Sequence, residues 1–120
     1  MKSPSLWVPV AVWAAIILVV SSLPGVEVDY FSFDWGDKLA HLGEYTVLGI
    51  LLARMFWVYR GRAASAAAGS LPLGIGLAAV DELHQIPIQN RYCEWGDFLF
   101  DGAGVVLGLA VYGLSRKARK

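Results

Sequence analysis

The sequence predicts an all-α integral membrane bundle of four transmembrane helices. Hydrophobic residues make up 57% of its 120 residues and charged residues only 17%, a composition too apolar for a soluble domain of this size to bury in one core. Stretches without charge cover residues 7–20, 63–80 and 102–114, and residues 45–59 are interrupted only by Arg54. Because backbone polar groups in lipid need internal partners, stretches of this length indicate helices.

We expect a single domain spanning residues 1–120, with helices over about residues 6–23, 37–59, 63–85 and 97–115. The first helix carries Pro9 near its start, where a missing amide hydrogen costs little. In the third, Pro72 and the surrounding glycines predict a kink or a close helix contact. The strictly apolar runs are shorter than the roughly 20 residues that cross a bilayer, so polar turns must complete the last three helices.

The charges predict how the chain sits in the membrane. Seven of the ten basic residues lie on the side of both termini and the middle loop: Lys2, Arg60, Arg62, Arg116, Lys117, Arg119 and Lys120. Arg54 lies close to this side, and only Lys38 and Arg91 lie opposite. The positive-inside rule therefore predicts a multi-pass cell-membrane protein with both termini in the cytoplasm. All ten acidic residues then fall toward the outer face.

A short repeat marks the start of the second and fourth helices. Residues 35–41 and 95–101 share the pattern Trp-Gly-Asp-x-Leu-x-(His or Asp), which is consistent with two repeated helical hairpins but too short to establish common ancestry. Asp37 and Asp97 stand where a helix begins, so helix capping is one interpretation of both. His41 and Asp101 lie one turn deeper on the same face.

The outer helix ends carry more negative charge than nearby cations can neutralise. Lys38 and Arg91 are the only fixed positive charges on that side. Six carboxylates gather there: Asp37, Glu44, Asp81, Glu82, Asp97 and Asp101. Asp81, Glu82 and Gln85 end the third helix, where the helix dipole and the membrane both disfavour negative charge. Protons, water, a bound cation or a cationic ligand must supply the balance. On the fourth helix, Gly104-x-x-x-Gly108 predicts close packing against another helix.

Two groups of residues resemble the signature of the VanZ-like membrane protein family. They cover roughly the last two-thirds of the chain: Asp37-Lys38 with His41, Tyr45, Leu48 and Gly49, and Asp81-Glu82 with Gln85, Arg91, Asp97, Gly104 and Gly108. The chain departs from the pattern at Asp101, where the family usually has asparagine, and at Gln89-Asn90, where Pro-Gly is usual. The resemblance implies a multispanning envelope protein of the type named for a member associated with low-level teicoplanin resistance.

Our leading hypothesis is that an outward-facing polar pocket binds an envelope component and so lowers susceptibility to glycopeptide antibiotics. A lipid headgroup, a peptidoglycan precursor or the glycopeptide itself would be the ligand, with Lys38 and Arg91 holding its anionic groups. The candidate ligand-binding residues are Asp37, Lys38, His41, Tyr45, Asp81, Glu82, Gln85, Arg91, Asp97 and Asp101.

The alternative is an intramembrane hydrolase or transferase that acts on a lipid-linked substrate of the outer leaflet. His41, Asp81 and Glu82 are the candidate catalytic residues, and a divalent cation could be held by Asp37, His41, Asp81 and Asp97. Proton or cation transport is disfavoured because Arg54 is the only charge below the outer turns. The basic residues at 116–120 form a short juxtamembrane tail, so no nucleic-acid partner is expected. Oligomeric state is left open.

Overall fold

The structure is a computed structural model that describes residues 4–23, 35–87 and 95–119, with the backbone only of Pro4, Trp35 and Asp37. All regular structure in these ranges is helical, which confirms the predicted all-α class. A 3-10 turn, η1 (Pro4–Leu6), is followed by four helices: α1 (Val8–Ser22), α2 (Trp35–Arg60), α3 (Ala63–His84) and α4 (Trp95–Ala118).

The boundaries of α2 and α4 differ from the predicted ones by up to three residues. Helices α2 and α4 begin at the tryptophan of the repeat, two residues earlier than expected. Asp97 is therefore the third residue of α4, within its first turn, rather than its first residue. Helix α4 also continues to Ala118 instead of ending at residue 115.

Helix α1 is shorter than predicted. Its 15 residues span about 22 Å at 1.5 Å per residue, less than the hydrocarbon thickness of about 30 Å. Pro9 occupies the second position of the helix, and the preceding chain forms η1 instead of a further α-helical turn. Helices α2, α3 and α4 are each long and apolar enough to cross a membrane, so the chain is a multi-pass membrane protein.

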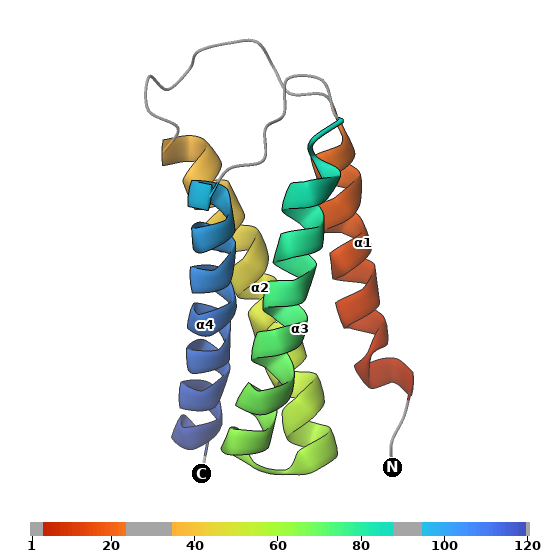
Figure 1. Cartoon of the computed structure of the whole chain (residues 1–120). Coiled ribbons are helices and arrows are strands. Elements are labelled where there is room, and N and C mark those ends of the chain that lie inside the picture. The colour runs from red at the N-terminus through yellow and green to blue at the C-terminus, as the bar shows by residue number, and fades with distance from the viewer. Residues whose placement is uncertain (1–3, 24–34, 88–94, 120) are drawn as a thin grey trace.

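The helices alternate in direction, so α2 and α4 run the same way (Figure 1). The start of α1, the α2–α3 turn and the end of α4 lie together at one end of the bundle. That turn is made by Gly61, whose φ of 79° is readily adopted by glycine. Its amide donates to the Trp57 carbonyl at 2.6 Å, which closes the last turn of α2.

Glycines let α2 and α4 pack backbone to backbone. A Cβ atom added at Gly104 would lie 2.7 Å from the Leu42 carbonyl oxygen, and one added at Gly49 would lie 2.6 Å from the Val105 carbonyl oxygen. Gly108 is closer still to the α2 backbone, at Thr46. The predicted packing of the Gly104-x-x-x-Gly108 stripe against another helix is therefore confirmed, and its partner is α2.

Helix α3 also makes close contacts around Pro72, through which it continues unbroken. A Cβ atom at Gly74 would lie 2.8 Å from a methyl group of Val105, and one at Gly69 would lie 2.5 Å from the Phe56 ring. Of the two predicted roles for this region, the structure supports close helix packing.

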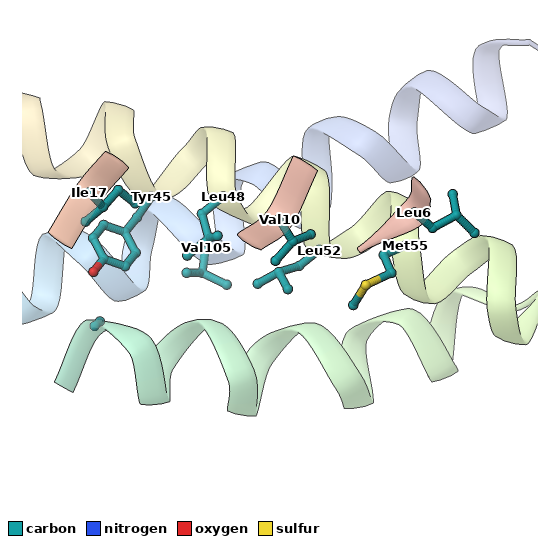
Figure 2. Packing of buried hydrophobic residues seen from close by; sticks show 9 residues of the cluster. Leu6, Val10, Ile17, Tyr45, Leu48, Leu52, Met55 and Val105 are labelled. Carbon is teal, nitrogen blue, oxygen red and sulfur yellow. The ribbon is translucent and has the colours of Figure 1, made fainter. Parts of the chain in front are cut away.

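A narrow apolar core runs along the bundle between α1, α2, α3 and α4. Figure 2 shows Tyr45 and Ile17 at one end of this core, and Leu6 and Met55 at the other. Many large apolar side chains instead face outward, as expected for a surface that contacts lipid; examples are Val19, Val58, Leu83, Leu99 and Leu114. Helix α1 is tied to α2 by the Trp13 indole, which donates to the Glu44 carbonyl at 2.9 Å.

Candidate functional site

Buried polar side chains gather at the end of the bundle opposite the start of α1 and the end of α4. They come from the first turns of α2 and α4 and from the last turns of α3, which lie at this end in Figure 1. Asp81 and Asp101 are completely buried, and the others are at most 9% exposed. We call this group the polar centre: Lys38, His41, Tyr45, Asp81, Glu82, Asp97 and Asp101.

Helix periodicity explains how three separate segments build the polar centre. On α2, Lys38, His41 and Tyr45 follow one another at intervals of three and four residues, and these intervals place them on one face. On α4, Asp97 and Asp101 are four residues apart and face α2. The tight glycine contacts between α2 and α4 begin one turn further along, at Gly104, so the two polar faces are held directly against each other.

Lys38 and Asp97 form a buried ion pair between α2 and α4. The Lys38 ammonium donates to Asp97 Oδ1 at 2.8 Å, and their side chains are 9% and 5% exposed. An unpaired charge at this depth would be strongly destabilising, whereas the pair satisfies both groups. The positive charge of Lys38 is therefore paired with the negative charge of Asp97 within the protein.

His41 lies at the middle of the polar centre and contacts carboxylates through both ring nitrogens. Its Nδ1 is 2.7 Å from Asp101 Oδ1 and 3.9 Å from Glu82 Oε2. Its Nε2 is 3.6 Å from Asp97 Oδ2, which is within ion-pairing range but too long for a hydrogen bond. His41 and Asp101 occupy equivalent positions of the two sequence repeats, so the repeats meet at this contact.

Asp81 joins the polar centre through Tyr45. The Tyr45 hydroxyl donates to Asp81 Oδ2 at 3.1 Å. Within the described part of the chain, Asp81 Oδ1 and Asp101 Oδ2 have no hydrogen-bond partner although both residues are fully buried. Buried carboxylate oxygens of this kind normally have a donor or a cation beside them, so each has capacity for one more contact.

Four residues of the polar centre are close enough to share a metal ion. One ligand atom each from His41, Asp81, Glu82 and Asp101 lies within 4.8 Å of the others. Two of them, His41 and Asp81, belong to the set expected from sequence, whereas Glu82 and Asp101 stand where Asp37 and Asp97 were expected. Asp97 contacts Lys38 and His41 instead, and the side chain of Asp37 lies outside the described residues.

The remaining candidates have different positions. Gln85 follows α3 directly and is 2% exposed, and its backbone amide donates to the Glu82 carbonyl at 3.2 Å. Arg91 lies outside the described residues. Sequence reasoning missed a polar link between α1 and α3, in which Ser22 Oγ and His84 Nε2 are 2.7 Å apart. The only sequence signal for it was a second histidine at the end of an apolar helix.

Comparisons with known proteins agree with the polar signature. No curated protein and no solved structure matches the chain significantly. The sequence model of one family, described as VanZ/LLP1, matches residues 5–116, which include α1, α2, α3 and all but the last two residues of α4. The chain belongs to the VanZ/LLP1 family, as the spacing of its buried His, Asp, Glu and Tyr residues indicated.

Proposed function

We propose that this VanZ-type envelope protein binds an envelope component through its polar centre and thereby lowers susceptibility to glycopeptide antibiotics. The observation that carries the proposal is the burial of four carboxylates and a histidine within apolar helices. Ionisable residues inside a membrane are costly and usually mark a functional site. An anchor or scaffold with the same helices would be more stable without them.

Our proposed topology puts the polar centre near the outer face of the cell membrane. Basic residues collect at the opposite end of the bundle: Arg60, Arg62, Arg116, Lys117 and Arg119. Arg116 also lies over the Trp57 ring, with 5.4 Å between its guanidinium carbon and the ring centroid, in an aromatic and cationic arrangement typical of a membrane interface. The positive-inside rule supports placing this end in the cytoplasm.

Reporter fusions test the topology. A fluorescent protein that folds only in the cytoplasm, fused after residue 120, should fluoresce. Alkaline phosphatase, which is active only outside the cytoplasm, should be active when inserted in the 88–94 segment and inactive after residue 120. The reverse pattern would place the polar centre on the cytoplasmic side and refute binding of an outer-leaflet component.

Ligands of this site would interact with an acidic centre rather than with Lys38. Because the Lys38 ammonium is paired with Asp97 at 2.8 Å, we assign it to charge neutralisation inside the protein. Arg91 remains the proposed contact for an anionic group of the ligand. The buried oxygens of Asp81 and Asp101 would accept from a donor or a cation that accompanies the ligand.

The experiment is overexpression in a teicoplanin-susceptible Gram-positive host, with the minimal inhibitory concentration as readout. Wild-type protein should raise this concentration, and Asp81→Asn or His41→Gln should abolish the increase. His84→Gln is the matched control, since the second histidine is exposed and lies outside the polar centre. Membrane levels must be equal by immunoblot. Undiminished tolerance with Asp81→Asn and His41→Gln would refute the proposal.

A second function is favoured by one observation, the position of His41 between carboxylates. A histidine with 2.7 Å to Asp101 has the partner that orients a general base, which suits an intramembrane hydrolase or transferase acting on a lipid-linked substrate. Mass spectrometry of polyprenyl-linked and phospholipid pools distinguishes the two functions. An enzyme changes the covalent structure of a lipid in a His41-dependent manner, whereas a binder leaves every pool unchanged.

A further inference from the structure

We infer that His41, Asp81, Glu82 and Asp101 together bind one divalent transition-metal ion between α2, α3 and α4. The inference rests on the proposed function of the polar centre and names the group in that centre that would contact the ligand. The ion would attract a phosphate or carboxylate group of the envelope ligand and act as the Lewis acid if the site is catalytic.

The first argument is the geometry of the four ligand atoms. They come from three helices and lie within 4.8 Å of one another. Ligand atoms about 2.1 Å from a shared transition metal are about 3.4 Å apart in a tetrahedral site and about 4.2 Å apart when they lie on opposite sides of the ion. The widest pair therefore needs to approach by about 0.6 to 1.4 Å, a change within the range of side-chain rotation.

The second argument is independent of the clustering. Asp81 Oδ1 and Asp101 Oδ2 belong to completely buried side chains and accept no hydrogen bond from the described residues. The other oxygen of Asp81 accepts from Tyr45, and the other oxygen of Asp101 lies 2.7 Å from His41 Nδ1. A bound ion would replace the proton shared in this second contact. One unused oxygen on each of two facing carboxylates is what a cation between them requires.

The third argument is the arrangement behind His41. Its Nδ1 faces Asp101 and Glu82, while Nε2 faces Asp97 Oδ2 at 3.6 Å. A metal-binding histidine usually directs its other ring nitrogen at a carboxylate, which orients the ring and fixes its tautomer. Asp97 is held in that position by Lys38 at 2.8 Å. The 3.6 Å contact is longer than a hydrogen bond, and it would have to shorten to one when an ion on Nδ1 leaves the ring proton on Nε2. Asp97 would then position His41 without being a ligand.

The ligand types select the class of metal. Three carboxylates and one imidazole form a mixed oxygen and nitrogen set, which suits Mn²⁺ or Zn²⁺ better than Mg²⁺ or Ca²⁺, since the last two favour oxygen alone. A divalent ion neutralises two of the three carboxylate charges. It also relieves the unfavourable position of Asp81 and Glu82 at the C-terminal end of α3, where the helix dipole opposes negative charge.

Manganese titration of the purified full-length chain, carrying no histidine tag, tests the inference in detergent or nanodiscs. The loss of the free Mn²⁺ signal in electron paramagnetic resonance should show one saturable site per chain, from which Zn²⁺ displaces Mn²⁺ and Mg²⁺ in equal amount does not. His41→Gln and Asp81→Asn should each weaken binding at least about tenfold, and His84→Gln should leave it unchanged. No saturable binding, or equal binding by all variants, would overturn the inference.

A measurement on a variant with the polar centre intact covers the case in which His41→Gln fails to fold. The chain has two histidines, so in His84→Gln any imidazole nitrogen coupled to bound Mn²⁺ belongs to His41. Electron spin echo modulation should contain this ¹⁴N coupling. Bound Mn²⁺ without it would show that His41 is not a ligand and would overturn the inference.

The two proposals can fail separately. If tolerance to teicoplanin depends on Asp81 and the purified protein binds no Mn²⁺ or Zn²⁺, the metal is refuted and the binding function stands. If the metal binds through His41 and tolerance is unaffected by Asp81→Asn, the proposed function is refuted and the metal site stands.

Discussion

The glycine contacts between α2 and α4 provide the sharpest test of the fold. In Gly104→Ala, the new methyl group would lie 2.7 Å from the Leu42 carbonyl oxygen and 2.9 Å from the Thr46 amide nitrogen. Ordinary contact begins at 3.4 Å, so the helices must separate by about 0.7 Å or distort locally. Overpacking of this kind costs about 1–3 kcal/mol. The neighbouring atoms are backbone atoms and the Tyr45 Cβ, which cannot rotate away.

Gly102→Ala is the matched control on the same helix, because nothing lies within 4 Å of a methyl group there. Both variants gain the helix propensity of alanine, about 1 kcal/mol, so the difference between them isolates the packing cost. Unfolding by sodium dodecyl sulfate in mixed micelles should show Gly104→Ala less stable than Gly102→Ala by about 1–3 kcal/mol. Equal stabilities would refute the close approach of α2 and α4.

Three further predictions concern buried polar groups and use the same unfolding assay. Lys38→Ala should lower the free energy of unfolding by about 3–5 kcal/mol, because it leaves Asp97 buried without its ion-pair partner. Lys38→Arg should recover most of the loss, and equal effects of the two substitutions would contradict a specific ion pair. Tyr45→Phe should cost about 1–3 kcal/mol, since Asp81 loses its donor, and a neutral result would mean that another donor replaces it. Ser70→Ala should be neutral or stabilising by up to about 1 kcal/mol, because the buried Ser70 hydroxyl has no partner among the described residues; a clear loss of stability would show that it has one.

Much of the architecture follows from the sequence because the bilayer imposes simple rules. Uncharged stretches of this length must be helices, and their number and order are confirmed. Helix ends were less predictable. The Trp-Gly pair before Asp97 has no helix-forming signal of its own, yet α4 begins at Trp95. At the N-terminus, Pro4 and Ser5 lie in a 3-10 turn, so α1 begins two residues later than expected.

The composition of the candidate site was also predictable, but its pairing was not. Spacing of four residues correctly placed Asp97 and Asp101 on one face of α4. Spacing within a helix carries no information about which residue of the neighbouring helix lies opposite. The Lys38–Asp97 ion pair therefore emerged only from the structure, as did the approach of Glu82 to His41.

The packing of α2 against α4 at the glycines affects the distances within the polar centre. Gly104 lies three residues after Asp101 on α4. Its contacts on α2 include Leu42, which follows His41 directly, and Tyr45, which lies one turn after it. The separation of the two helices at these glycines therefore sets the 2.7 Å distance between His41 and Asp101. A side chain at Gly104 would widen this distance before it unfolded the bundle. Gly104→Ala should consequently weaken Mn²⁺ binding although Gly104 offers no ligand atom, whereas Gly102→Ala should not.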